Sequence, residues 1–310
     1  MKPDSTIYVA GHSGLVGSAV VRVLRAAGHT RLLLRSHAEL DLTRQSEVLD
    51  FLAAERPEYI FHCAGRVGGI QANSARGADF IRDNLLMATN IIEGAWRAGT
   101  AKLLVLGSSC MYPRACPQPA KEEYLFTGPL EPTNQPYAVA KLATLELARA
   151  HRAQHGLNVI CAIPTNAYGP GDNFDPEASH VIPGLLRRFA AAQAAGEAEV
   201  SVWGSGQPVR EFIHSDDLAA ALLHLMRHYD SPEPLNVGTG SGIRIAELAQ
   251  AVAEVVGLEA RLVFDAGKPD GMPVKMLDSS RVLALGWQPR IALREGLADT
   301  WRWYRQQAGA

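Results

Sequence analysis

A glycine-rich segment near the N-terminus constrains the fold more than any other feature of this 310-residue chain. Gly11, Gly14 and Gly17 have the spacing GxxGxxG and lie between an apolar run at residues 6–10 and a helix pattern at residues 15–27. Glycines in such a place let the backbone turn tightly and approach a pyrophosphate at the positive end of a helix. Ordinary turns are also rich in glycine, but the position between a strand and a helix predicts a dinucleotide-binding unit.

Strand and helix patterns alternate through the first half of the chain. Further strand patterns occur at residues 31–34, 59–63, 102–107 and 158–163, and helix patterns at residues 45–54, 78–98 and 136–155. This alternation predicts an α/β fold with a Rossmann-type, doubly wound parallel sheet.

The second half is less regular, which indicates a second, smaller α/β domain for the substrate. Helix patterns occur at residues 217–226 and 245–256, and residues 235–237 fit one more strand of the main sheet. We therefore expect residues 1–165 and 208–242 to form the dinucleotide-binding domain. Residues 166–207 and 243–310 are expected to form the substrate domain.

The bulk composition argues against several classes of protein. The net charge of −2 gives no basic field for nucleic acid or an anionic membrane, and no apolar run reaches the roughly 20 residues of a membrane span. The N-terminal residues enter the first strand without an apolar signal sequence. The cysteines, Cys63, Cys110, Cys116 and Cys161, show no CxxC spacing, so we expect reduced thiols in a cytoplasmic protein and no metal site.

The end of the second strand bears on the choice between NAD and NADP. An acidic residue there binds the ribose 2′-hydroxyl of NAD, whereas an arginine accommodates the 2′-phosphate of NADP. Here the strand ends with Leu34 and Arg35, and no carboxylate follows before Glu39. This pattern favours NADP, with Asp41 near the adenine; the alternative is that Arg35 is only a surface charge.

Tyr137 and Lys141 form a YxxxK pair at the start of a predicted helix. Residues four apart share a helix face, so both side chains can meet one ligand. The ordinary pKa of tyrosine, near 10, makes it a poor proton donor or acceptor at neutrality, and a nearby ammonium is expected to lower that pKa. Lys141 is also expected to bond the hydroxyls of the nicotinamide ribose.

Ser108 and Cys110 follow the predicted strand at residues 102–107. Ligands of open α/β sheets bind beyond the carboxyl ends of the strands. Residues two apart in an extended segment point to the same side, so a hydroxyl can hold a carbonyl oxygen while a thiol faces the neighbouring carbon. The alternatives are a strand-end cap for Ser108 and a packing role for Cys110. Together with the YxxxK pair, the pattern predicts an oxidoreductase that acts on a carbonyl group.

Several further segments carry a specific resemblance that covers nearly the whole chain. They are residues 66–70 (RVGGI), 107–113 (GSSCMYP), 131–141 (EPTNQPYAVAK), 164–170 (PTNAYGP), 172–174 (DNF), 179–183 (SHVIP), 202–206 (VWGSG), 210–214 (REFIH) and 263–271 (VFDAGKPDG). With these segments the chain resembles the GDP-L-fucose synthase family of extended short-chain dehydrogenase/reductases. That family converts GDP-4-keto-6-deoxy-D-mannose to GDP-L-fucose by 3,5-epimerisation and 4-reduction.

The resemblance implies a division of labour among five catalytic residues, Tyr137, Lys141, Ser108, Cys110 and His180. The 4-keto group acidifies the protons on carbons 3 and 5, and Tyr137 and Ser108 stabilise the resulting enolate. Cys110 and His180 occupy the family positions of the base and the acid that invert these carbons. Hydride from NADPH then reduces carbon 4, and Tyr137 supplies the proton.

The resemblance also implies binding positions for the substrate and the cofactor. The positions that match GDP-sugar contacts are Arg188, Trp203, Arg210 and Asp270; surface ion pairs and, for Trp203, a core position are the alternatives. The positions expected to line the cofactor are Gly11, His12, Ser13, Gly14, Leu15, Val16, Gly17, Arg35, Asp41, Leu106, Gly107, Ser108, Ser109, Tyr137, Lys141, Pro164, Thr165, Asn166, Ala167 and His180. Ser13 departs from the bacterial pattern, which often has an arginine near the 2′-phosphate, so use of NADH beside NADPH stays open. The family generally forms homodimers, here through helices 78–98 and 136–155.

Other functions remain to be weighed against this interpretation. A related epimerase/reductase of a GDP-colitose or GDP-heptose pathway would keep the chemistry and change the sugar. A sugar-nucleotide 4-epimerase needs no Cys/His pair, and a 4,6-dehydratase typically has acidic residues where this chain has Ser109 and Cys110. A non-catalytic module that senses NADP would be expected to lose the tyrosine, lysine or serine, and all three are present.

Overall fold

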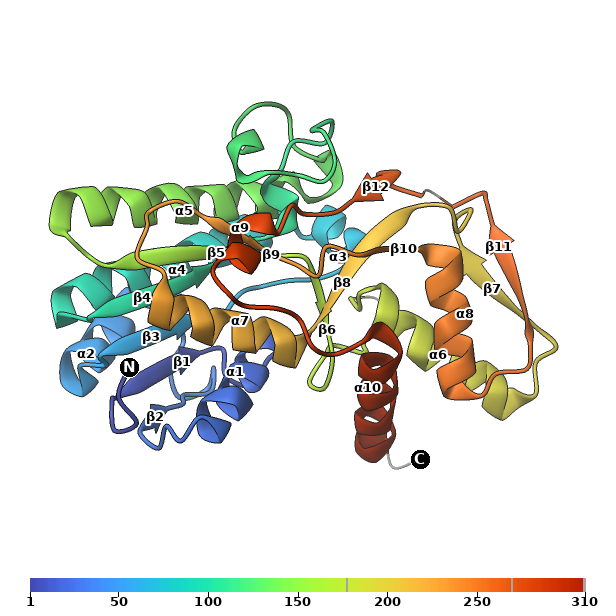
Figure 1. The fold of residues 1–310 in the computed structure, drawn as a ribbon, viewed down its shortest axis with the longest axis horizontal. Helices are drawn as coiled ribbons and strands as arrows, with labels where there is room; N and C mark the ends of the chain where they lie inside the picture. Colours follow the sequence, from blue (N-terminus) through green and yellow to red (C-terminus); the bar gives the residue numbers. More distant parts are fainter. Residues whose placement is uncertain (177, 269, 309–310) are drawn as a thin grey trace.

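The computed structural model describes residues 1–176, 178–268 and 270–308 (Figure 1). Its central element is a six-stranded sheet in the order β2-β1-β3-β4-β5-β9, in which every pair of neighbours is parallel. The strands are β1 (Ile7–Ala10), β2 (Leu32–Leu33), β3 (Tyr59–His62), β4 (Lys102–Leu106), β5 (Val159–Pro164) and β9 (Leu235–Val237). Since β2 and β3 lie on opposite sides of β1, the strand order reverses there and leaves a crevice beyond the end of β1.

Helices cover both faces of this sheet, which explains why its strands are mostly apolar on both sides. Leu103 and Val105 of β4 pack toward α2 (Gln45–Glu55), α4 (Gly77–Ala98) and α5 (Gln135–His155). Leu104 and Leu106 point to the other side, toward α1 (Leu15–Ala26) and α7 (Ser215–His228). A parallel strand buried on both faces reads as a continuous apolar run rather than an alternating one.

A second domain lies at the other end of the molecule (Figure 1). Its mixed sheet contains β6 (Asn166–Tyr168), β8 (Val209–His214), β10 (Gly242–Arg244) and β12 (Val274–Lys275), and β7 (Glu199–Trp203) pairs with β11 (Arg261–Asp265). The helices α6 (Val181–Ala195), α8 (Ile245–Val256) and α10 (Leu293–Ala308) enclose a separate core that includes Phe189, Leu248 and Leu297. The remaining short helices are α3 (Ile70–Ala75), α9 (Ser280–Ala284) and three 3₁₀ turns at Ser109–Met111, Glu122–Tyr124 and Pro132–Asn134.

Glu211 of β8 joins the two domains. Its carboxylate is fully buried and accepts the backbone N–H groups of Gly240 at 2.7 Å and Leu277 at 2.9 Å. Its carbonyl oxygen accepts the side chains of Thr165 at 3.1 Å and Asn166 at 2.8 Å. A buried carboxylate is tolerated when N–H groups of this kind satisfy it, so Glu211 fixes β8 against the segments that follow β5, β9 and β12.

The structure confirms the predicted fold class and corrects the domain boundaries in two places. β8 (residues 209–214) belongs to the second sheet, although residues 208–242 were assigned to the dinucleotide-binding domain. Val282 and Trp287 pack in the core beneath α1 and α7, although residues 243–310 were assigned to the substrate domain. The physical reason is that the chain crosses between the domains repeatedly. β8 and the segment that contains Val282 and Trp287 are short, and neither has a hydrophobic periodicity that would assign it to one domain.

Within the described residues, no helix combines the length and the apolar character that crossing a membrane would require.

Asp172, in the turn between β6 and α6, is a buried acid, and no described residue provides a countercharge for it. The preceding turn residue, Gly171, packs against the start of α1, where a Cβ atom would lie 2.9 Å from Ser18 Oγ. One oxygen of Asp172 accepts the N–H of Asn173 at 2.7 Å, and the other has no partner among the described residues. Burial raises the pKa of the Asp172 carboxyl to about 7.

Because this folded-state pKa lies above the usual 3.8, the unfolded chain ionises first as the pH rises. The native state should therefore lose up to about 4 kcal/mol of stability between pH 4 and pH 7, with no further change from this group above pH 7. Asp172→Asn removes this titrating group. The free energy of unfolding of the variant should therefore rise relative to that of the wild type by up to the same amount between pH 4 and pH 7. Urea unfolding at pH 4.5 and pH 8 measures this, and a difference between the two proteins that does not change with pH would contradict it.

Candidate active site

Two glycines bring the end of β1 and the start of α1 into close contact. Gly11 has φ +78°, and a Cβ atom there would lie 2.7 Å from the backbone nitrogen of Ala64. A Cβ atom at Gly17 would lie 2.0 Å from the carbonyl oxygen of Gly11. Neither position accepts a side chain without movement of backbone. The glycine spacing found in the sequence therefore has a steric cause.

The start of α1 is open to an anionic ligand. The helix begins at Leu15 without a side-chain cap and without an acidic residue in its first turn. Ser13 and Gly14 are exposed, and His12, Leu15 and Val16 are partly exposed. Uncapped N–H groups at a helix start form a ready binding site for phosphate.

The other predicted cofactor positions lie at the carboxyl ends of the neighbouring strands β4 and β5, where Leu106 pairs with Ala162. They are Leu106, Gly107, Ser108 and Ser109 after β4, and Pro164, Thr165, Asn166 and Ala167 after β5. The amide of Asn166 and the hydroxyl of Thr165 both donate to Glu211, so these two side chains are held in place by β8.

Arg35 and Asp41 already have protein partners. Arg35 Nη2 lies 3.0 Å from Glu55 Oε1, and its guanidinium lies over the ring of Phe51 at 5.3 Å. Asp41 accepts the N–H and the hydroxyl of Thr43 at 3.0 and 2.7 Å. An anion would have to draw Arg35 away from Glu55, and Asp41 is engaged in the turn before α2.

The pair Tyr137 and Lys141 lies on the first turns of α5, against the end of β4. Lys141 is buried, and its Nζ donates to the carbonyl of Leu106 at 2.9 Å. The same Nζ lies 5.8 Å from the centroid of the Tyr137 ring. Tyr137 is hydrogen bonded to Ser108, so α5 and the end of β4 meet through two polar contacts.

The electrostatics of the pair differ from the expectation. Burial raises the pKa of Tyr137, and the neighbouring Cys110 raises it further, while the hydrogen bond with Ser108 lowers it. Lys141 does not lower the pKa of Tyr137 as predicted, because its ammonium is directed to Leu106 and burial dominates. Burial also lowers the pKa of Lys141 to about 8, and Cys161 and Cys63 oppose that shift.

Cys110 reaches the site by a route other than the predicted one. Residues Ser109–Met111 form a 3₁₀ turn instead of an extended segment, and Ser108 Oγ accepts the N–H of Cys110 at 3.2 Å. The turn still places the thiol beside Tyr137. Its Sγ accepts from Asn134 Nδ2 at 3.1 Å and from Lys275 Nζ at 3.3 Å.

His180 lies at the N-cap position of α6. Its side chain is exposed to solvent. The surrounding protein and the charge of Lys275 both lower the pKa of His180. The charge of Lys275 thus acts on His180, while its Nζ is hydrogen bonded to Cys110.

The loop that carries His180 is held by the segment after β3. Gly69 N–H donates to the carbonyl of Ala178 at 3.1 Å, and a Cβ atom at Gly69 would lie 2.9 Å from the carbonyl oxygen of Ser179. The buried amide of Asn73 donates to the carbonyls of Gly68 at 2.6 Å and Gly69 at 3.1 Å. The RVGGI segment therefore has a visible role in positioning His180.

The predicted substrate contacts all lie in the second domain. Burial lowers the pKa of Arg188 on α6 and of Arg210 on β8, and Arg188 Nε has no partner among the described residues. Trp203, at the end of β7, is 62% exposed, and Lys268 Nζ lies 5.6 Å from its ring centroid. Asp270 is committed to the turn after Trp203, where it accepts the N–H of Ser205 at 2.7 Å and its hydroxyl at 2.6 Å.

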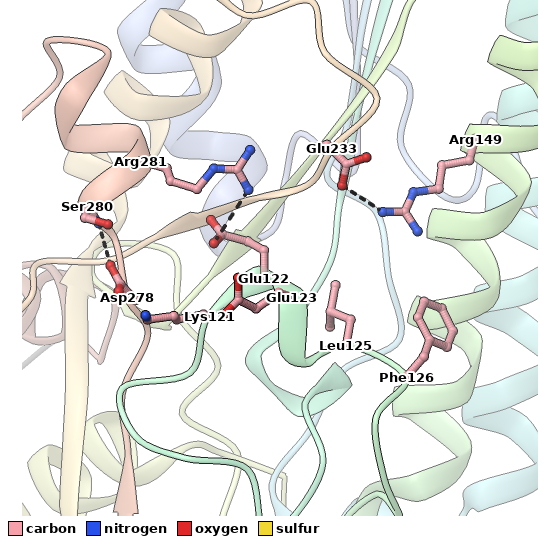
Figure 2. A pocket seen from close by; sticks show the side chains of 10 residues that line it. All are labelled: Lys121, Glu122, Glu123, Leu125, Phe126, Arg149, Glu233, Asp278, Ser280 and Arg281. Atoms are coloured by element: carbon pink, nitrogen blue, oxygen red, sulfur yellow. Dashed lines mark hydrogen bonds and ion pairs between the residues drawn. The ribbon is translucent and has the colours of Figure 1, made fainter.

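A separate cavity of about 490 Å³ lies between the 3₁₀ turn at Glu122–Tyr124, α5 and the start of α9 (Figure 2). Its charged groups pair with one another: Arg149 with Glu233 at 3.2 Å, and Arg281 with Glu122 at 3.7 Å. Glu233 precedes β9, so this cavity lies toward the amino end of that strand, away from the crevice. Across residues 1–176, 178–268 and 270–308, no three His, Cys, Asp or Glu side chains gather as a metal site would require.

Sequence reasoning missed two residues that contact the thiol, Asn134 and Lys275. Asn134 lies within the segment 131–141 that carries the resemblance, and its position three residues before Tyr137 was a usable signal. Lys275 follows the last recognised segment, and 165 residues separate it from Cys110. No spacing in the sequence links the two.

Comparisons with known proteins identify the family of the chain. Residues 7–238 match the NAD dependent epimerase/dehydratase family. The chain is 55% identical to the probable GDP-L-fucose synthase 1 of Oryza sativa subsp. japonica over 96% of this chain and 91% of that protein. It is 48% identical to the GDP-L-fucose synthase of Escherichia coli (strain K12) over 96% of each chain.

A solved structure has the same architecture. The GDP-L-fucose synthetase from Naegleria fowleri bound to NADP superposes with a TM-score of 0.93 at 28% identity, covering 100% of this chain and 97% of that one. The chain therefore belongs to the NAD dependent epimerase/dehydratase family and, within it, to the GDP-L-fucose synthases.

Proposed function

We propose that this protein converts GDP-4-keto-6-deoxy-D-mannose to GDP-L-fucose with NADPH. The observation that carries the proposal is the gathering of Ser108, Cys110 and Tyr137, with Lys275 bonded to the thiol and its charge acting on His180. A sugar-nucleotide 4-epimerase needs no acid–base pair such as Cys110 and His180. A 4,6-dehydratase would need acidic residues beside Ser108. The relatives named as GDP-L-fucose synthases support the identity of the sugar.

The residues at the crevice fit a nicotinamide dinucleotide. The glycine cradle at Gly11 and Gly17 and the uncapped start of α1 suit its pyrophosphate. Lys141 uses one of its three N–H donors on Leu106, and no other acceptor is within bonding distance in the part of the chain described here. Its remaining donors suit ribose hydroxyls. When bound, NADPH supplies the hydride that reduces carbon 4.

The preference for NADP is part of the proposal. A neighbour with 28% identity was solved with NADP, and Arg35 stands at the end of β2 as the candidate for the 2′-phosphate. Arg35 would exchange its contact with Glu55 for that phosphate. Because Ser13 offers no second cation, NADH is expected to serve as a weaker substitute.

Epimerisation is assigned to Cys110 and His180. The Cys110 sulfur takes the proton from carbon 3 or 5, so the C–H bond breaks, an S–H bond forms and the electron pair moves to oxygen 4. Tyr137 and Ser108 hydrogen bond the enolate oxygen, and His180 returns a proton to the opposite face of the carbon. In the reduction that follows, Tyr137 gives its proton to oxygen 4.

The nucleotide end of the substrate is assigned to the second domain. Arg188 and Arg210 are partly desolvated guanidiniums, and Arg210 donates only to the carbonyls of Val209 and Asp270, so a diphosphate could give both side chains paired, charge-assisted bonds. Trp203 offers an exposed ring to the base. Asp270 is also kept as a contact of the GDP-sugar, and its bonds to Ser205 hold the turn that follows Trp203.

We also propose a cytoplasmic homodimer that associates through α4 and α5. These helices pack side by side on one face of the molecule (Figure 1) and expose apolar side chains, Leu86 and Trp96 on α4 and Val139 on α5. Burial of such side chains against a second copy is a common basis of twofold dimers.

Incubation with GDP-4-keto-6-deoxy-D-mannose and NADPH should give GDP-L-fucose, identified by NMR. Tyr137→Phe should lower the rate of NADPH consumption by about 10²–10⁴, which is the usual contribution of a general acid. The variant should still bind NADPH, which controls for misfolding. Turnover close to the wild-type rate would remove Tyr137 as the proton donor, and no product from the wild type would reject the function.

Cys110→Ala should abolish exchange of solvent deuterium into carbons 3 and 5 of the substrate when NADPH is omitted. The physical reason is that alanine has no group to accept the proton. NMR of the recovered substrate measures the exchange, and Cys116→Ala, which removes a thiol with no assigned role, is the matched control. Undiminished exchange at both carbons would assign the base to another residue.

Leu86→Glu should convert a dimer to the 33.4 kDa protomer in light scattering, because a carboxylate would be buried in the interface. Leu285→Glu changes a similarly exposed leucine near α9 and should leave the dimer intact. A monomeric wild type, or a dimer that survives Leu86→Glu, would contradict the proposed interface.

A further inference from the structure

The sulfur of Cys110 has two hydrogen-bond donors from distant parts of the chain. Asn134 Nδ2 lies 3.1 Å from Sγ, and Lys275 Nζ lies 3.3 Å from it. A neutral thiol is a weak acceptor, whereas a thiolate is favoured by a neighbouring ammonium. Two converging donors, one of them cationic, form the environment of an anion.

Both donors are held by the fold. Asn134 immediately precedes α5, the helix that carries Tyr137 and Lys141, and its buried Oδ1 has no partner within the described residues. Lys275 lies on β12, opposite Arg210 of β8. The next two residues are tied by backbone N–H bonds, Met276 to Gln118 and Leu277 to Glu211, each at 2.9 Å. The amide of Asn134 is thus oriented with its NH₂ group toward the sulfur.

We propose that Lys275 and Asn134 hold Cys110 as a thiolate, which makes Lys275 a positioning residue of the epimerisation. The proposal deepens the proposed function, because it concerns the residue assigned as the base. Lys275 acts through Cys110 and takes no proton from the sugar. It supplies the charge that keeps the sulfur deprotonated before substrate binds.

The charges around the sulfur are consistent with this role. Among the described residues, the titratable groups that interact with Cys110 are Tyr137 of α5 and Lys275 of β12. Asn134 adds a neutral donor to the sulfur, and Ser108 Oγ accepts the backbone N–H of Cys110. Lys275 also disfavours the protonated form of His180 and lowers the pKa of that imidazole. A thiolate beside Lys275 offsets this charge, so His180 can carry the proton that it returns to the sugar.

Alkylation of Cys110 by iodoacetamide tests the proposal on the full-length protein without any sugar nucleotide. Peptide mass spectrometry follows the rate at Cys110. Lys275→Met should lower this rate by at least about tenfold at pH 7, and the deficit should largely vanish at pH 10, where a thiol ionises without help. Lys275→Arg keeps a cation and should retain most of the rate.

Two further variants make the result specific. Lys121→Met removes an exposed lysine beside Asp278 and should leave the rate at Cys110 unchanged. Asn134→Asp exchanges a donor for a carboxylate of the same shape and should slow alkylation at pH 7 even if Lys275→Met fails to fold. A wild-type rate in Lys275→Met at pH 7 would overturn the proposal. So would an equal deficit at pH 7 and pH 10, since that would reflect access to the sulfur and not its charge.

The outcome separates this inference from the proposed function. If Cys110 loses its reactivity at pH 7 in Lys275→Met but the wild type does not turn over the keto-sugar, the inference that Lys275 stabilises a Cys110 thiolate stands and the proposed function is rejected. Normal reactivity in Lys275→Met, with GDP-L-fucose formed by the wild type, would reject the inference alone.

Discussion

The hydrogen bond from Lys141 to the carbonyl of Leu106 joins the two segments on which the chemistry depends. One segment is the start of α5 with Asn134 and Tyr137, and the other is the end of β4 with Ser108 and Cys110. A buried ammonium with an incomplete set of acceptors is costly, and its lowered pKa reflects that cost. In return, the contact between Lys141 and Leu106 sets the distance between the Tyr137 phenol and the segment that holds the Cys110 thiol.

The second domain completes the site from the opposite side. Glu211 anchors β8 to the loops after β5 and β9 and to the segment after β12, so Arg210 and Lys275 are carried on a rigid frame. His180 reaches the same region from the start of α6, with its loop supported by Gly69. The Tyr137 phenol, the Cys110 thiol and the Lys141 ammonium thus come from one domain, and His180, Arg210 and Lys275 come from the other.

The sequence allowed the first domain to be predicted closely, and the reasons are physical. Strands buried on both faces are continuous apolar runs, and helices α1, α2, α4 and α5 have clear boundaries, so local patterns were sufficient. The strands β6, β10 and β12 have two or three residues each, and their pairing depends on distant segments. The turn at Ser109–Met111 and the contact of Lys275 with Cys110 depend on tertiary packing, and neither leaves a periodic trace.

The central claim is that one site inverts two carbons and reduces a third. The most direct measurement is the NMR spectrum, together with the mass, of the GDP-sugar formed by the wild type from substrate of natural isotope content and NADPH in D₂O, after return to ordinary water. Carbons 3 and 5 should each retain one deuterium and carbon 4 none, because its hydride comes from NADPH. A product with no deuterium on carbons 3 and 5, or with deuterium on only one of them, would contradict the account.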